Sequence, residues 1–341
     1  YFREALGRFR ATHYRYGEGL ALNALGACAS TQGDWETGRD YYLQSITVAR
    51  AIGNRRNEAN ALNNLSEIFI SQGNYVQAQA YCEQAMQLKQ EVNDRRGLAM
   101  SLGNLGNLAK FQGDYQTAGE RYTEALEIFR ELGDLQGQAI ALTGLTMLAC
   151  HQGRPEEGLR HAEAGCEIAR GMGERHVYAT ALTNLGHALT DLERYAEAQT
   201  AYEEALALRQ ALQQPILVLE PLAGLAESAR VRGDLATAQV HVETILARLE
   251  ADSSLHGSDE PFRIYLACIR VLRDLEDSRA ATLAAQAHAL LQKQAATIRE
   301  RRLRRAYLEE VRPHRELLAL YRELTAKETS CSSGTLPRMK P

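Results

Sequence analysis

The stretch Leu102-Gly103-Asn104-Leu105-Gly106-Asn107, closed by Gln112-Gly113-Asp114-Tyr115, returns in related form every 40 residues along the chain. Two leucine columns run through six copies without a break. One holds Leu22, Leu62, Leu102, Leu142, Leu182 and Leu222, and the other holds Leu25, Leu65, Leu105, Leu145, Leu185 and Leu225. A fixed period of this length indicates a stacked array of similar structural units.

Each unit predicts two helices joined by a tight turn. Leu102, Leu105 and Ala109 have the spacing of one apolar helix face. Gly113 and Asp114 then mark a helix end and a turn, and a second amphipathic stretch follows. A single hairpin of this kind cannot bury its apolar face, whereas stacked neighbours bury it for one another. We therefore expect the column leucines, Leu105 among them, to form the core.

The pattern resembles the tetratricopeptide repeat. In the third unit the residues that carry the resemblance are Leu102, Leu105, Gly106, Ala118, Tyr122 and Ala125. The match extends over residues 1–299, and the period is that of the family's longer-repeat branch. It implies an all-α fold, a right-handed α-solenoid superhelix of stacked antiparallel helical hairpins, in which the first helices line a concave groove.

The repeat divides the chain into five segments. We expect a truncated second helix of a preceding repeat at 1–14, six 40-residue units at 15–254, a degenerate seventh repeat at 255–299, capping helices at 300–324 and a disordered tail at 325–341. Pro215 suits a first helical turn, and Pro313 should split the capping segment in two. Because residue 1 falls inside a repeat, the chain is expected to be a fragment of a longer protein.

A second resemblance lies in the C-terminal part, between Pro261 and Glu316. Its clearest parts are Pro261-Phe262-Arg263-Ile264-Tyr265-Leu266 and Leu303-Arg304-Arg305-Ala306-Tyr307-Leu308. These resemble the end of large bacterial signalling proteins, in which a tetratricopeptide array follows a nucleotide-binding switch domain of the STAND ATPase or cyclase-associated type. The resemblance implies that this chain is a sensor or regulatory arm, with the ATPase upstream.

The composition restricts the partners. Charged residues make up 24% of the chain and the net charge is −4, which makes a nucleic-acid partner unlikely from charge alone. No apolar run approaches the length of a membrane span. The six cysteines include no CxxC pair, which is typical of a reduced cytoplasmic protein.

The leucine columns fix the helical phase, and so the residues that should face the groove. The expected peptide-binding residues are Asn60, Asn63, Asn64, Glu67, Met100, Asn104, Asn107, Lys110, Phe111, Ile140, Met147, His151, Thr183, Asn184, His187 and Glu227. Asparagine is a poor residue for a helix interior. The family resemblance implies that Asn64, Asn104 and Asn184 hold the main chain of a ligand. Bracing of adjacent hairpins is the alternative, and both remain open.

No motif in the sequence indicates catalysis. We find no phosphate loop, HExxH, GxSxG or paired cysteines, so neither a catalytic residue nor a metal or other cofactor is expected. The leading hypothesis is a non-enzymatic scaffold that binds a protein or peptide in the concave groove. One alternative is a self-associating scaffold that forms homo-oligomers. The other is an arm of a multidomain ATPase or transcriptional regulator that binds a small molecule or nucleic acid near the arginines of 299–305, which otherwise form a solvated helix face.

Overall fold

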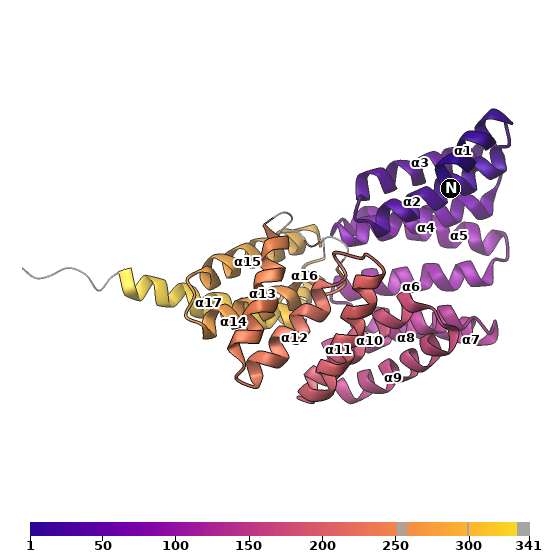
Figure 1. Cartoon of the computed structure of the whole chain (residues 1–341). Helices are drawn as coiled ribbons and strands as arrows, with labels where there is room; N and C mark the ends of the chain where they lie inside the picture. The colour runs from indigo at the N-terminus through magenta and orange to yellow at the C-terminus, as the bar shows by residue number, and fades with distance from the viewer. Residues whose placement is uncertain (251–254, 256–257, 299, 333–341) are drawn as a thin grey trace, which may run out of the picture.

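A computed structural model describes residues 1–250, 255, 258–298 and 300–332, with side chains up to Ala326, and this part contains helices and no strand. The helices are α1 (Phe2–Ala11), α2 (Arg15–Thr31), α3 (Trp35–Ala51), α4 (Arg55–Ser71), α5 (Tyr75–Glu91), α6 (Arg95–Phe111), α7 (Tyr115–Glu131), α8 (Leu135–His151), α9 (Pro155–Met172), α10 (Arg175–Asp191), α11 (Tyr195–Ala211), α12 (Leu219–Val231), α13 (Leu235–Leu249), α14 (Pro261–Asp274), α15 (Arg279–Thr297), α16 (Arg301–Glu309) and α17 (Arg312–Ser332). The predicted all-α solenoid of stacked hairpins is confirmed (Figure 1).

Each unit folds into a hairpin because its turn is encoded locally. In the third unit, Gly113 adopts φ +77°, a left-handed conformation that costs glycine little. Asp114 then caps α7, since its carboxylate accepts the Thr117 N–H at 3.2 Å. In the fifth unit the same left-handed position is held by Glu193, at φ 61°. The turn geometry is therefore kept even where the glycine is missing.

Neighbouring helices approach closely where an aromatic ring packs against glycines, which have no side chain in the way. Tyr122 of α7 is almost fully buried, and a Cβ added to Gly106 or Gly144 would lie only 2.7 or 2.6 Å from its ring. The ring thus packs between the first helix of its own unit and that of the next. Its hydroxyl donates to the Asn107 Oδ1 at 2.7 Å. This packing joins consecutive first helices into one layer, the inner layer.

The two leucine columns differ in burial. The column of Leu102 is buried in all six units, whereas Leu105, Leu145 and Leu185 of the other column are only partly buried. The expectation that Leu105 lies in the core is therefore wrong in degree. The middle units turn this column partly away from the hairpin interior, and Leu105 packs at the edge of the cluster formed with the C-terminal helices.

The sixth unit begins later than its prolines suggested. Pro215 does not lie in a first helical turn, because α12 starts only at Leu219. A helix starting near residue 215 would place Pro221 in its interior, where the ring breaks a backbone hydrogen bond. A start at Leu219 puts Pro221 within the first turn, where no such bond is lost.

Four helices, α14–α17, make up the described C-terminal part of the chain. The helices α14 and α15 occupy the expected seventh repeat, and Pro313 in the first turn of α17 separates it from α16. The tail expected to be disordered from residue 325 instead continues α17 through Ser332, where Ala326, Lys327 and Glu328 are good helix formers. Residues 333–341 lie outside the described residues.

The C-terminal helices fold back onto the array as well as extending it. One hydrophobic cluster combines Ile70, Tyr75 and Leu108 of the second and third units with Phe262 and Tyr307 of the C-terminal part. Figure 1 shows α12–α17 gathered on one side of the molecule, with α16 reaching toward the early repeats. None of the described helices is both long and apolar enough to cross a membrane.

The difference between the leucine columns yields a stability prediction. Leu102 is only 2% exposed. Leu102→Ala should therefore lower the free energy of unfolding by about 2–5 kcal/mol, because removal of a buried leucine side chain leaves a cavity. Leu105→Ala should cost clearly less, because its side chain is already partly in water. Urea unfolding followed by circular dichroism measures both. An equal or larger loss at Leu105 would mean that the helical phase is misassigned.

Candidate functional site

Charged side chains meet where the C-terminal ends of the first helices face the C-terminal part of the chain. Lys110, His151 and Asp191 stand at the ends of α6, α8 and α10, one repeat apart, so they lie at the same edge of the inner layer. We call their contacts with the later residues the polar seam. It comprises Lys110, His151, His187, Asp191, Glu220, Ser258, Asp259, Glu260, Arg263 and Arg312.

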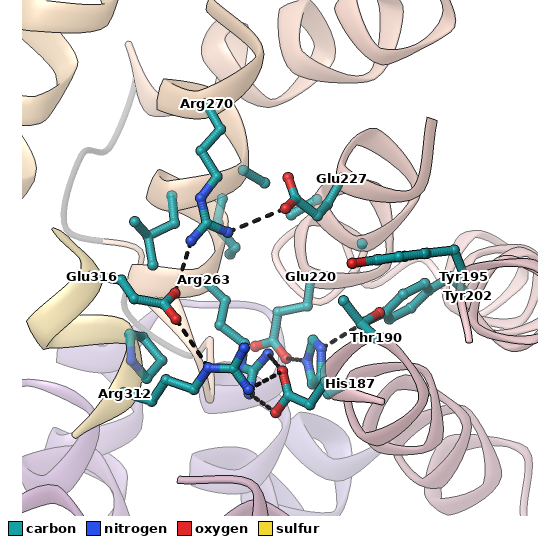
Figure 2. Close-up of a pocket in the computed structure, with 17 residues that line it drawn as sticks. His187, Thr190, Tyr195, Tyr202, Glu220, Glu227, Arg263, Arg270, Arg312 and Glu316 are labelled. Atoms are coloured by element: carbon teal, nitrogen blue, oxygen red, sulfur yellow. Dashed lines mark hydrogen bonds and ion pairs between the residues drawn. The ribbon is translucent and has the colours of Figure 1, made fainter. Parts of the chain in front are cut away.

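A paired aspartate joins α10 to α14 and α17. The two carboxylate oxygens of Asp191 accept from Arg263 at 3.2 and 2.9 Å, and Arg312 lies 3.3 Å from one of them (Figure 2). Burial would raise the pKa of the Asp191 carboxyl, but the two arginines outweigh burial and hold that pKa below its usual range. The bidentate geometry makes this contact strong as well as directional.

A small cavity of about 100 Å³ lies beside this aspartate, between α10, α12, α14 and α17. Arg270 spans it, donating to Glu227 at 3.2 Å and to Glu316 at 2.8 Å (Figure 2). Arg230 also binds Glu227, at 2.8 Å. Because these charges satisfy one another and the space suits only a few waters, the cavity is part of the structure rather than a ligand pocket.

The carboxylate of Glu220, in the first turn of α12, holds a stretch of main chain. One of its oxygens accepts the Ser258 hydroxyl at 2.6 Å, the Asp259 N–H at 2.7 Å and the Glu260 N–H at 3.2 Å. His187 lies 3.5 Å from the other oxygen. Burial would raise the pKa of Glu220, but His187 and Ser258 outweigh it and lower that pKa. A first helix therefore binds the main chain of a bent loop segment of the same protein.

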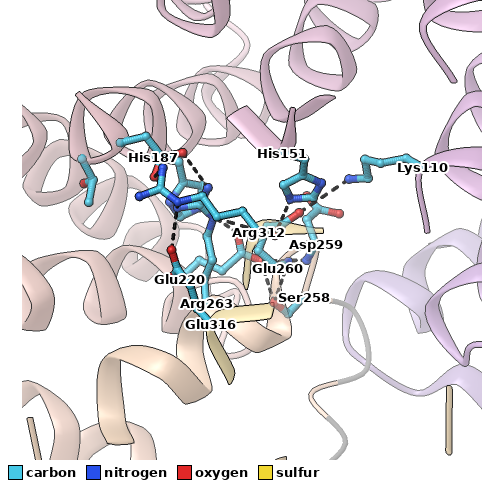
Figure 3. Close-up of polar contacts among 12 residues, drawn as sticks. Lys110, His151, His187, Glu220, Ser258, Asp259, Glu260, Arg263, Arg312 and Glu316 are labelled. Atoms are coloured by element: carbon cyan, nitrogen blue, oxygen red, sulfur yellow. Dashed lines mark hydrogen bonds and ion pairs between the residues drawn. The ribbon is translucent and has the colours of Figure 1, made fainter. Parts of the chain in front are cut away.

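Glu260 carries the longest-range contact of the seam. One carboxylate oxygen lies 3.0 Å from the His151 Nε2 and the other 3.7 Å from the Lys110 Nζ, with all three side chains nearly buried (Figure 3). Burial would raise the pKa of Glu260, but His151, Lys110 and Arg263 together hold that pKa far below its usual range. The carboxylate is thus charged at neutral pH and ties α14 to the third and fourth units.

The predicted groove residues divide into two groups. Eight are buried in or beside the seam and the inner layer: Asn63, Asn104, Lys110, Met147, His151, Thr183, Asn184 and His187. Phe111 and Glu227 are partly buried, the first stacked on Tyr75 and the second in the small cavity. Of the other six, Asn60, Asn64, Met100 and Asn107 are half-buried, whereas Glu67 and Ile140 are exposed. We call these six residues the open face. Ile140 is the most exposed apolar member, at 54%.

Several asparagines make contacts between neighbouring first helices. Asn64 donates to the Asn23 Oδ1 at 3.2 Å, and Asn104 donates to the Glu67 Oε1 at 3.0 Å. The Asn63 Oδ1 accepts the Ser101 hydroxyl at 3.0 Å. These bonds brace the stack. A contribution to ligand binding stays a prediction for the asparagines of the open face.

The sequence did not single out Ser258, Asp259, Glu260 or Arg263. Ser258, Asp259 and Glu260 belong to the polar run before Pro261, and Arg263 follows that run directly. A charged run between two apolar helices was the available signal. Its partners lie 38 to 150 residues away, and nothing in the local sequence identifies them.

The described residues offer no assembled reactive centre. They contain no group of three or more histidine, cysteine, aspartate or glutamate side chains placed to hold a metal ion. Burial raises the pKa of the Cys82 and Cys150 thiols to about 12, so neither presents a thiolate at neutral pH.

The charge of Glu260 predicts a pH-dependent stability. At pH 7, Glu260→Gln should lose about 3–5 kcal/mol of unfolding free energy, because Lys110 and His151 stay buried without their partner. The folded-state pKa of Glu260 lies below the unfolded value of about 4.3, so its contribution is present above that pH and is lost as the pH falls through the folded-state pKa. The difference in unfolding free energy between the unchanged protein and Glu260→Gln should stay constant from pH 7 to 5 and become smaller below about pH 4.

Urea unfolding at each pH checks this prediction. The matched control is Glu131→Gln, whose carboxylate pairs with Arg95 while both side chains are more than half exposed. Glu131→Gln should lower the free energy of unfolding by no more than about 1 kcal/mol. Equal losses at the two glutamates would show that Glu260 adds nothing beyond a surface ion pair.

Comparison with known proteins places the chain. The sequence model of the tetratricopeptide repeat family matches residues 17–78, 57–131 and 137–211, which together make up more than half of the chain. No curated protein matches in sequence. Among solved structures, a Rap protein complexed with Competence and Sporulation Factor aligns over 96% of this chain and 97% of its own, with a TM-score of 0.54 and 15% identity.

A second solved structure is a STAND protein (Signal Transduction ATPase with Numerous Domains) with a tetratricopeptide repeat sensor, from Pyrococcus horikoshii. It aligns over 85% of this chain with a TM-score of 0.52 and 14% identity, and this chain spans 44% of its length. At these identities the likeness concerns the fold. With the repeated hairpins and the matched residues, it leads to one conclusion: the chain belongs to the tetratricopeptide repeat family.

Proposed function

We propose that this chain is a non-enzymatic scaffold that binds an extended peptide, or an extended segment of a protein, on the open face of its second to fourth units. In this proposal it serves as the sensor or regulatory arm of a larger signalling protein. The free, buried state of Cys82, Cys150, Cys166 and Cys268 supports a reducing compartment such as the cytoplasm.

The observation that carries the proposal is the segment Ser258–Glu260. Its two main-chain N–H groups bind a first-helix carboxylate, and its glutamate side chain meets a lysine and a histidine of two other first helices. The inner layer therefore already presents groups that bind main-chain N–H groups and an acidic side chain, and a peptide ligand offers both. The open face continues this layer on α4, α6 and α8.

The composition of the open face suits such a ligand. Met100 and Ile140 occupy the same repeat position in neighbouring units, and they leave apolar surface accessible. Asn64 and Asn107 place amides nearby, and Glu67 adds a carboxylate that accepts from Asn104 at 3.0 Å. Apolar anchors surrounded by polar groups are typical of peptide recognition.

The comparisons support the class of function. The Rap structure is a complex with Competence and Sporulation Factor, so a protein of this fold accommodates a bound partner. The archaeal STAND structure is described as having a tetratricopeptide repeat sensor. These statements concern those proteins, and we extend them to this chain as part of the proposal.

Selection from a library of random phage-displayed peptides against the immobilised full chain tests the proposal. Synthetic versions of the enriched peptides are then titrated by fluorescence anisotropy. Ile140→Glu should weaken binding at least tenfold, because it places a charge at the apolar centre of the open face. Val240→Glu, on the outer helix α13 at 66% exposure, is the matched control and should leave binding unchanged. No enriched peptide, or equal weakening by both variants, would contradict the proposal.

A further inference from the structure

A second pocket lies outside the open face, where two turns of the array meet the C-terminal helices. It has a volume of about 860 Å³. One wall is the turn after α6, around Gly113, and the next is the turn after α8, around Gln152; α16 and the start of α17 close the third side. The α16 backbone lies so close to Gly113 that an added Cβ would be 2.7 Å from the Tyr307 nitrogen. The walls of the pocket are therefore held at a fixed separation.

Positive charge dominates this pocket. Four arginines line it, namely Arg154, Arg302, Arg312 and Arg315, against the two carboxylates of Asp114 and Glu310. Asp114 is already engaged as the cap of α7, and Arg312 is engaged with Asp191 and Glu316. Arg154 and Arg302 pair only with exposed or half-exposed glutamates. Arg315 is exposed and has no ion-pair partner among the described residues.

Two polar atoms in the pocket wall are buried without a partner. The Tyr115 hydroxyl and the His151 Nδ1 have no hydrogen-bond partner among the described residues, although His151 is only 7% exposed. The opposite nitrogen of His151, Nε2, lies 3.0 Å from the Glu260 carboxylate. The two rings are neighbours, with centroids 6.0 Å apart. Both atoms are closed off from water, so they lie behind the pocket surface, and the arginines are the groups that face a ligand.

We propose that this pocket binds a small organic anion that carries two or more negative charges on phosphate or carboxylate groups. Arginine matches both groups through paired N–H donors. Leu303 and Ala306 give the ligand an apolar wall. The volume lies within the usual range for small-molecule sites. A bound anion would bridge the third and fourth units and the C-terminal helices.

Isothermal titration calorimetry on the full chain tests the site, with inorganic pyrophosphate and citrate as separate probes at fixed ionic strength. Binding of pyrophosphate alone would identify a phosphate site, and binding of citrate alone a carboxylate site. For whichever probe binds, the double variant Arg302→Gln with Arg315→Gln should raise the Kd at least tenfold.

The control is Arg301→Gln with Arg322→Gln, which removes the same charge from exposed positions of α16 and α17 outside the pocket. It should leave the Kd unchanged, and circular dichroism should show equal helix content in both double variants. Failure of both probes to bind at millimolar concentration would overturn the proposal. So would equal weakening by the two double variants, which would reveal only a general attraction of anions to positive surface. Neither result bears on peptide binding at the open face.

Discussion

The buried carboxylate of Glu260 is the contact on which the arrangement of this molecule depends. It meets Lys110 and His151, which belong to units 150 and 109 residues earlier in the chain. A charge buried this deeply is favourable only with its partners in place, since desolvation otherwise exceeds the Coulombic gain. The contact therefore fixes where α14 begins relative to the third and fourth units. Two further contacts hold the same edge in place: the ion pair of Asp191 with Arg263, and the hydrogen bond from the Asp259 N–H to Glu220.

This edge divides the inner layer into two functional parts. At the C-terminal ends of the first helices, the chain's own residues occupy the polar groups, so Lys110, His151 and His187 are unavailable to a separate ligand as they stand. Nearer the helix middles, Met100, Asn64 and Ile140 remain accessible. The array thus holds a loop segment of its own chain at one edge, and it leaves a neighbouring surface of the same first helices open. Stacked hairpins suit such a surface because each adds another helix to it.

The sequence predicts the repeated parts well and the junction poorly. The hairpins and their stacking could be predicted because a short sequence pattern in each repeat encodes them. That pattern includes the leucine at the position of Leu102, the turn at Gly113 and the small residues that pack against Tyr122. The burial of Leu105 was overestimated, because periodicity defines a helix face without defining how far that face turns toward solvent. The helix start predicted from Pro215 was wrong, because α12 begins only at Leu219, which places Pro221 in its first turn. The partners of Glu260 could not be predicted, since a pairing across 150 residues leaves no local pattern. The groove positions followed from helical phase, but which of them stay open depends on that pairing.

Amide hydrogen exchange at Asp259 and Glu260 in the intact protein tests the central claim most directly. Their N–H groups point to the Glu220 carboxylate, in a segment held on the inner layer by the polar seam. The account predicts exchange slowed at least about a hundredfold relative to an unstructured chain, because opening requires that the buried charges separate. Exchange at the unstructured rate for both amides, with the helices of the array still protected, would contradict the claim that this segment is held there.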